Sequence, residues 1–212
     1  MVSGRLEVAP ERFESVLARW VDEHDGASVT RDPALDLRPD PPGSPGTIGL
    51  RWSGGGVSCV GFPYDPLGLI LVRRGGYAVG LSHAGRLTDV KVGRRRVQGR
   101  TAAGGWSQQR YARRRENQAD ELVEAVAAHA GRILGGHLGG IPQRGGVRGL
   151  VVGGDRSLVT AVLAEPPATF LADLPRRELP DLPDPDARVL ARALWRGRAV
   201  WCVGAVEQLS AR

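Results

Sequence analysis

The sequence predicts an α/β protein in which an antiparallel β-meander is followed by helices and strands in alternation. Short apolar runs follow one another closely between residues 67 and 97. Gly75-Gly76, between the first two runs, would supply the positive φ angles of a tight hairpin. Later in the chain, apolar residues at helical spacing alternate with strand-like runs. This order is typical of a mixed sheet with helices packed on it.

The N-terminal residues predict one helix and a connector. Pro10 suits the first turn of a helix, and Gly26 suits its end. Its apolar residues recur at a spacing of three and four: Phe13, Val16, Leu17, Trp20 and Val21. Residues 31–46 are dense in Pro, Asp and Gly and predict a loop, and the role of the Pro-rich 32–46 segment stays open. We therefore predict two parts, a helix with a connector at 1–46 and a main domain at 47–212, which starts with a strand at 47–52.

The main domain contains the meander, a long helix and then shorter elements. The long helix spans residues 113–134 and has an apolar stripe formed by Leu122, Val123, Val126, Ala127, Ala130 and Ile133. Gly135-Gly136 is a helix stop. A strand, a Gly-Gly-Asp turn and a helix follow at 147–165, then a strand at 176–183, a helix at 184–197 and a final strand at 199–209. The ribonuclease-H-like architecture has this order of elements.

Composition points to an anionic partner. The chain of 212 residues has a formal net charge of +6, and Lys91 is its only lysine. Arginine binds phosphate through two parallel hydrogen bonds and stacks on bases, so this bias suits RNA. A GC-rich genome would also enrich arginine, alanine and glycine, but it would not explain where the arginines cluster.

The two cysteines, Cys59 and Cys202, form neither a disulfide framework nor a zinc-ligand spacing. We expect both to be buried, reduced thiols in a cytoplasmic protein. The N-terminus lacks the pattern of a signal peptide, and no apolar run is long enough to span a membrane. We therefore expect no membrane association.

A basic run surrounds a glycine-rich segment. No acidic residue lies between Lys91 and Arg115. The arginines of this run are Arg94, Arg95, Arg96, Arg100, Arg110, Arg113, Arg114 and Arg115. A local field of one sign attracts the phosphate backbone of nucleic acids. A solvated helix face with an adjoining loop is the alternative, but such a face normally carries compensating acids.

The glycine-rich segment contains almost no conventional catalytic side chain. Gly104 and Gly105 give the backbone wide freedom, and Trp106 either stacks on a partner or packs back onto the domain. Gln108 and Gln109 follow. A glutamine amide cannot exchange protons at physiological pH, so it can only orient water or bind a transition state. Such a residue needs a substrate that is already activated, for example an ester.

Residues 99–122, "GRTAAGGWSQQRYARRRENQADEL", resemble the catalytic loop of the Vms-like release factor family, in its actinobacterial branch. That family is similar to the middle domain of the eukaryotic class-1 translation termination factor. The resemblance implies a ribonuclease-H-like core that presents a glutamine loop to the peptidyl-transferase centre. It assigns catalysis first to Gln108, with Gln109 as its neighbour, and assigns the loop to Gly104, Gly105, Trp106 and Ser107.

One departure and several rival chemistries bear on this interpretation. In termination factors the glutamine follows two glycines directly, whereas Trp106 and Ser107 intervene here.

A metal-dependent nuclease would need converging carboxylates, and the strand at 67–72 supplies none. Candidates elsewhere are Asp89, Glu116, Asp120 and Asp155. The Gly-Gly-Asp at 153–155 could cradle phosphate, but a strand-to-helix turn explains it better. Ser107 lacks a nearby histidine, and His83 and His129 suit structural roles.

The sequence thus predicts a ribosome-associated peptidyl-tRNA hydrolase that needs no metal or cofactor, with residues 47–212 as its release-factor-like catalytic domain. Its partners would be the large ribosomal subunit, at the peptidyl-transferase centre, and peptidyl-tRNA, which the arginines of the basic run would bind. We expect a monomer. The alternative is a non-catalytic module that binds ribosomal RNA or tRNA through the same basic segment.

Overall fold

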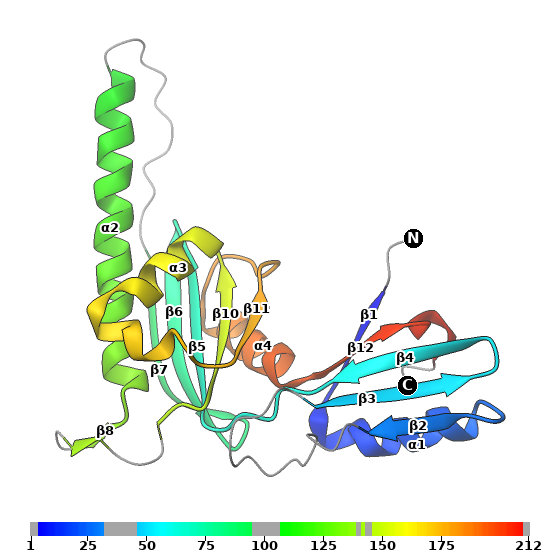
Figure 1. The fold of residues 1–212 in the computed structure, drawn as a ribbon. Helices are drawn as coiled ribbons and strands as arrows, with labels where there is room; N and C mark the ends of the chain where they lie inside the picture. The colour runs from blue at the N-terminus through cyan, green and yellow to red at the C-terminus, as the bar shows by residue number, and fades with distance from the viewer. Residues whose placement is uncertain (1–3, 32–45, 95–106, 139–140, 143–145, 210–212) are drawn as a thin grey trace. The chain divides into compact units, whose positions relative to one another are not determined.

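A computed structural model describes residues 4–31, 46–94, 107–138, 141–142 and 146–209 (Figure 1). The chain forms two compact units. Unit 1 comprises Met1–Tyr64 and Trp195–Arg212, and unit 2 comprises Asp65–Leu194. These bounds differ from the predicted parts at 1–46 and 47–212, whose functional division stays a prediction. Most of the predicted connector at 32–46 lies outside the described residues.

Unit 1 is a five-stranded antiparallel sheet with one helix on it. The strands lie in the order β1-β12-β4-β3-β2. Phe13, Val16, Leu17 and Trp20 of the helix form a core with the inward side chains of the sheet, as their spacing predicts. Its elements are β1 (Arg5–Val8), η1 (Pro10–Arg12), α1 (Phe13–Asp22), β2 (Ser28–Arg31), β3 (Thr47–Trp52), β4 (Gly55–Val60), β12 (Val200–Gly204) and η4 (Val206–Gln208).

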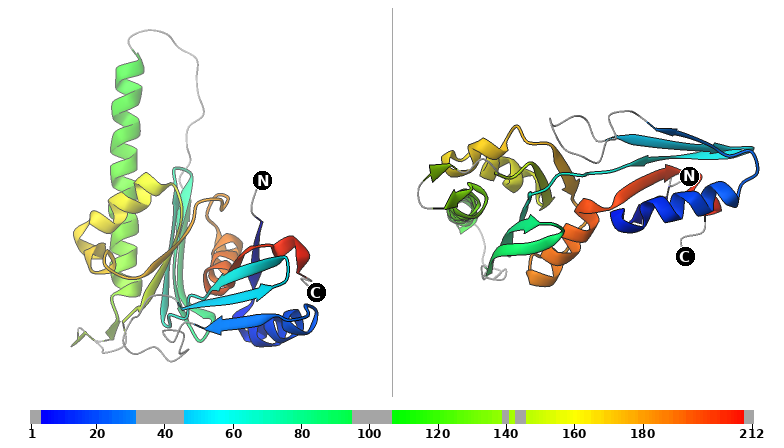
Figure 2. Two further views of the ribbon diagram at one scale, coloured as in Figure 1. Left: turned by 45° about the vertical axis from the view of Figure 1, so that its right-hand side comes forward. Right: turned by 90° about the horizontal axis from the view of Figure 1, so that it is seen from below.

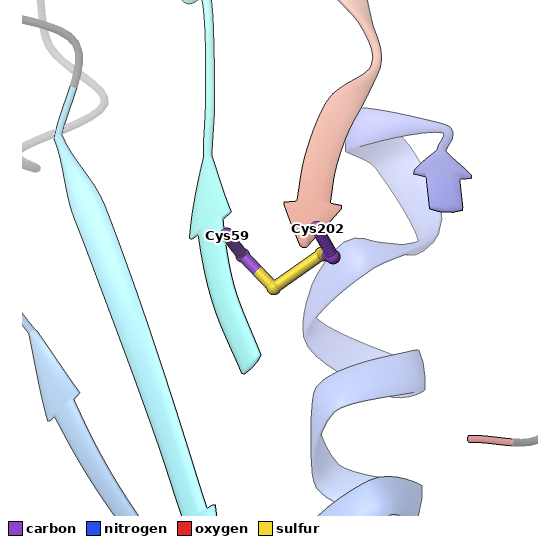
Figure 3. The surroundings of a disulfide bond; sticks show 2 residues. All are labelled: Cys59 and Cys202. Atoms are coloured by element: carbon purple, nitrogen blue, oxygen red, sulfur yellow. A yellow bond between two sulfur atoms is a disulfide. The ribbon is translucent and has the colours of Figure 1, made fainter. Parts of the chain in front are cut away.

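A disulfide joins the two cysteines within this sheet (Figure 3). Cys59 in β4 and Cys202 in β12 are registered neighbours on paired strands, and both are buried. The prediction that both cysteines are buried is confirmed, and the prediction that they are reduced is wrong. The sequence hides their proximity, because 143 positions separate them along the chain.

The C-terminal end of helix α4 (Ala187–Arg198) forms ion pairs with acidic residues of β1 and η1. Arg196 is buried, and its Nε and Nη2 donate to the carboxylate of Glu7 at 3.0–3.1 Å. Arg198 pairs with Glu11 at 2.6 Å, where both side chains are more exposed. The same helix end therefore carries one buried pair and one solvent-accessible pair.

Unit 2 contains a second five-stranded sheet, in the order β11-β10-β5-β6-β7. Strands β5, β6 and β7 form the predicted antiparallel meander, and β10 and β11 run parallel to β5. Its elements are β5 (Leu67–Arg73), β6 (Gly76–His83), β7 (Arg86–Arg94), α2 (Ser107–Leu134), β8 (His137–Leu138), β9 (Ile141–Pro142), β10 (Gly149–Gly154), α3 (Arg156–Ala164), η3 (Pro166–Leu171), β11 (Arg176–Leu179) and α4 (Ala187–Arg198).

Helices cover both faces of this sheet (Figure 2). Helices α2 and α3 pack on the face that includes Ile70, Val72 and Val79. On the opposite face, Gly80 approaches Leu190 of α4. Side chains alternate between the two faces along each strand, so the apolar runs of β5 and β10 reflect burial on both sides.

The predicted mixed α/β class is confirmed, but two strands do not join the meander. The strands predicted at 47–52 and 199–209 lie in the sheet of unit 1. Their local pattern identifies them as strands but does not determine which sheet they enter, because pairing depends on distant segments.

The predicted hairpin after β5 is present, but φ is not positive at Gly75 or Gly76. In the next turn, φ is positive at Gly85.

The long helix is confirmed over the predicted stripe and starts earlier. All six stripe residues are buried, and the helix ends before Gly136, whose φ is +64°. Helix α2 begins at Ser107, not at residue 113. Gln, Ala and Arg are good helix formers, and no proline or glycine lies between Trp106 and Gly131. None of the helices in the described ranges is long and apolar enough to cross a membrane.

The two ion pairs give a first prediction. Arg196→Met should lower the free energy of unfolding by about 3 kcal/mol, because it leaves the largely buried Glu7 carboxylate with the partly exposed Arg5 as its remaining ion-pair partner in the described ranges. Arg198→Met is the matched control and should cost less than about 1 kcal/mol, because its pair is exposed. Urea denaturation of both variants checks this. Equal losses would contradict the assignment of the buried pair as the stronger one.

Candidate functional site

The described part of the predicted site lies at the end of β7 and the start of α2. Arg94 is the last residue of β7 and is exposed. Ser107, Gln108 and Gln109 are the first three residues of α2. The other arginines of this helix segment are Arg110, Arg113, Arg114 and Arg115. The remaining predicted site residues, Arg95, Arg96, Arg100, Gly104, Gly105 and Trp106, lie outside the described residues.

Helix α2 extends well past the sheet at its N-terminal end (Figure 1). Among the side chains of α2 that the structure describes, from residue 117 onward, the first buried one is Leu122, with Ala119 partly buried before it. At about 1.5 Å of rise per residue, Gln108 lies roughly 21 Å along the helix axis from Leu122. The helix therefore has a packed C-terminal half and an N-terminal half that extends away from the core.

Tyr77 fixes the end of β7 against α2. Its partner in the antiparallel register is Gly93, one residue before Arg94. A Cβ atom on Gly93 would lie 2.7 Å from Tyr77 Oη and still closer to ring carbons, so the ring occupies the place of a side chain. The same ring also stacks on the imidazole of His129 of α2, with the two ring centroids 5.6 Å apart. One aromatic ring thus contacts both elements that flank residues 95–106.

A close contact with η3 also holds the packed half of α2 in place. Gly131 of α2 faces η3, and a Cβ atom there would lie 2.6 Å from the carbonyl oxygen of Pro167. Ala168 and Leu171 of η3 belong to the same buried core as the α2 stripe. The glycine allows a backbone-to-backbone contact that no other residue would permit without a shift.

Charged groups border the packed half of α2. Arg132 Nη1 lies 3.7 Å from Asp89 Oδ2 of β7. Burial lowers the pKa of His129, and the positive charges of Lys91 and Arg132 lower it further. The imidazole is therefore favoured in its neutral form, which suits a ring stacked in an apolar contact. This agrees with the structural role that the sequence suggested for His129.

The Gly-Gly-Asp at 153–155 forms a strand-to-helix turn. The Asp155 carboxylate caps α3 by accepting hydrogen bonds from the backbone amides of Ser157 and Leu158 and from the Ser157 hydroxyl. These bonds, led by the hydroxyl, lower the pKa of Asp155. The side chain therefore satisfies the helix end itself, and the interpretation as a turn is confirmed.

Two of the carboxylates considered for a nuclease serve other contacts. Asp155 caps α3, and Asp89 faces Arg132. No three His, Cys, Asp or Glu side chains gather in a metal-binding arrangement within the ranges that the structure describes. His83 pairs with Asp65 at 3.1 Å, and Asp65 also accepts the amide of Ala84, so this histidine closes the turn after β6.

The positioning residues Tyr77, Gly93 and Gly131 were not predicted. A glycine inside an otherwise regular strand, such as Gly93 in β7, is a signal of close approach and could have been noted. Its partner could not be read from the sequence, because a bulge between Leu81 and Ser82 shifts the β6–β7 register. Gly131 inside a helical pattern is a similar signal whose partner, η3, depends on the tertiary fold.

Comparison with known proteins places the chain near release factors. A sequence model described as Actinobacteria/chloroflexi VLRF1 release factor matches residues 65–203, more than half of the chain. The "Peptide chain release factor subunit 1" of Pyrococcus abyssi is 33% identical over 92 residues, which is 42% of this chain and 21% of that protein. The protein of the same name from Thermococcus onnurineus is 32% identical over 92 residues, with the same shares. The chain thus spans about a fifth of the length of these relatives.

The contact between Tyr77 and Gly93 gives a second prediction. Gly93→Ala should lower the free energy of unfolding by about 1–3 kcal/mol, because the new methyl group overlaps the tyrosine ring. In a Tyr77→Ala background the same change should cost almost nothing, so a double-mutant cycle reports the overlap directly.

Gly146→Ala is the matched control, because a Cβ there meets no atom within 4 Å. Urea denaturation measures all four variants. If Gly93→Ala costs no more than Gly146→Ala, Tyr77 does not fix the end of β7.

Proposed function

The chain belongs to the Actinobacteria/chloroflexi VLRF1 release factor family, and we propose that it releases nascent peptides as a ribosome-associated peptidyl-tRNA hydrolase. Its substrate would be the ester that joins the peptide to tRNA in the peptidyl-transferase centre of the large ribosomal subunit. The N-terminal end of α2, with Gln108 and Gln109, would carry the reaction. The single observation that supports this best is the extent of α2 beyond its packed half.

The reach of α2 suits a substrate at the bottom of a narrow site. Roughly 21 Å of helix separates Gln108 from Leu122, the first buried residue among the described side chains of α2. A helix is stiff over this length, and the contacts of Tyr77 and Gly131 fix its other half. A projecting helix can therefore hold a small catalytic group in place while the bulk of unit 2 stays at the entrance.

The glutamine would not need to transfer a proton. Its amide would orient a water molecule toward the ester carbonyl, or a backbone amide would donate to the developing oxyanion. Gly104 and Gly105 would let the backbone approach the substrate. Much of the rate would come from the ribosome, which already holds the ester in position. The reaction would need no metal or cofactor.

The charge near the start of α2 supports an RNA partner. A helix N-terminus carries a partial positive charge that acts over its first turn, so Arg110 is unfavourable there within an isolated helix, and Arg113, Arg114 and Arg115 add positive charge in the next turns. The first turn holds no acidic residue to compensate. A phosphate backbone would offset both charges, and these arginines would bind ribosomal RNA or the acceptor end of tRNA.

We further propose that unit 2 has the ribonuclease-H-like arrangement that the resemblance implies. The order β11-β10-β5-β6-β7, with an antiparallel meander and two parallel strands, supports this, as does the position of α2 after the meander. A cytoplasmic monomer is the form proposed for the protein. A non-catalytic RNA-binding module that uses the same arginines is the alternative.

Peptide release from stalled ribosome–peptidyl-tRNA complexes tests the proposal. Gln108→Ala should slow release on the order of a hundredfold, because it removes a group that stabilises the transition state. Gln109→Ala determines which of the two residues acts. Gln118→Ala, in the same helix, is the matched control and should release peptide as the wild type does.

Binding to the same complexes is measured in parallel. If the wild type and all three variants release peptide equally, the glutamines do not act. If none of them releases peptide while all bind, the protein is the non-catalytic module. Hydrolysis of free peptidyl-tRNA should be much slower than on the ribosome.

A further inference from the structure

Helix α4 has a buried face and an exposed face of unusual composition. Its buried residues are Val189, Leu190, Ala193, Leu194, Arg196 and Gly197. Its exposed residues are Ala187, Arg188, Ala191, Arg192 and Trp195. Arg188, Arg192 and Trp195 follow one another at intervals of four and three, so they share one side of the helix. We call these three residues the α4 face.

Trp195 is more exposed than expected for a large aromatic side chain on a surface that binds no partner. It is 49% exposed, although its ring is among the largest apolar groups in the chain. One turn earlier on the same side is Ala191, which is also exposed. Exposed tryptophans are enriched where a surface binds a partner, because the flat ring supplies much contact area for little conformational entropy.

The two arginines of the α4 face differ from the other arginines of the same helix. Arg196 and Arg198 pair with Glu7 and Glu11. Arg188 and Arg192 are exposed, and no carboxylate within the described ranges forms an ion pair with either of them. The α4 face therefore carries positive charge that no ion pair within the described ranges neutralises.

We propose that the α4 face is a second RNA-binding surface, separate from the start of α2, where a base of single-stranded RNA stacks on Trp195 and phosphates contact Arg188 and Arg192. This rests on the proposed function in taking ribosomal RNA as the natural source of the strand. An RNA strand uses both parts of the face, because it offers a flat base beside each phosphate. An acidic protein segment would complement the arginines alone.

The surface would supply affinity and leave the reaction to α2. Stacking on an aromatic side chain tolerates any base, so the α4 face would recognise RNA without reading its sequence. Each phosphate neutralised releases counterions, and binding would weaken as salt rises. Two contacts on separate elements would also restrict how the protein is oriented on its partner.

Fluorescence anisotropy with a labelled single-stranded oligouridine tests this on the full chain. Arg188→Ala with Arg192→Ala should reduce the slope of log affinity against log salt by about 1.4, at about 0.7 for each phosphate contact. Trp195→Ala should weaken binding about tenfold, the effect of losing one stacked base. Trp195→Phe should retain most of the affinity, because the smaller ring still stacks.

The controls remove similar groups elsewhere. Arg12→Ala with Arg86→Ala removes the same charge from two other exposed arginines. Phe170→Ala removes an aromatic ring that is 50% exposed. If these controls lose as much affinity as the α4 variants, net charge and exposed rings in general explain binding, and the α4 face is no RNA site. Unchanged affinity in the α4 variants, with wild-type thermal unfolding, overturns the proposal equally.

Two further measurements separate this proposal from the others. Polyglutamate of matched length should compete poorly, and strong competition that does not depend on Trp195 would indicate an acidic protein partner and overturn the RNA assignment. Gln108→Ala should bind oligouridine as the wild type does. The α4 proposal therefore fails on RNA affinity alone, whereas the proposed hydrolase fails on peptide release alone.

Discussion

The structure depends on the packing of the C-terminal half of α2 against the sheet of unit 2. The stripe from Leu122 to Ile133 forms one core with β5, β6, β10 and α3. Two glycines permit this fit, Gly93 under the ring of Tyr77 and Gly131 against η3. A side chain at either position would force atoms apart and weaken this packing. The direction of its free half follows from that placement.

The division of α2 into a packed half and an extended half also divides its chemistry. The packed half is apolar, with Asp89, Lys91 and Arg132 at its border. The extended half is polar and starts with two glutamines and an arginine run. The core thus supplies the stiffness, and the ribosome would supply the alignment of the ester and the counter-charge. This distribution explains how a helix whose first turn holds no acidic residue could serve catalysis.

Much of this could be predicted where the pattern is local. The stripe of α2, its end at Gly135-Gly136 and the three-stranded meander follow from periodicity and turn residues. Features that join distant segments could not be predicted. Cys59 and Cys202 meet because β12 enters the sheet of unit 1, and Tyr77 meets Gly93 through a register that a bulge shifts. The sequence pattern predicts the start of α2 six residues too late, because the polar first turns of the helix carry no apolar stripe.

We propose that α2 carries Gln108 to the ester while its other half stays packed on unit 2. An electron cryo-microscopy map of the Gln108→Ala variant on a ribosome with intact peptidyl-tRNA would show this. We expect the N-terminal end of α2 to point into the peptidyl-transferase centre, with residue 108 beside the tRNA 3′ end and the Tyr77–His129 contact retained. A bound protein whose α2 points away from the ester would contradict it.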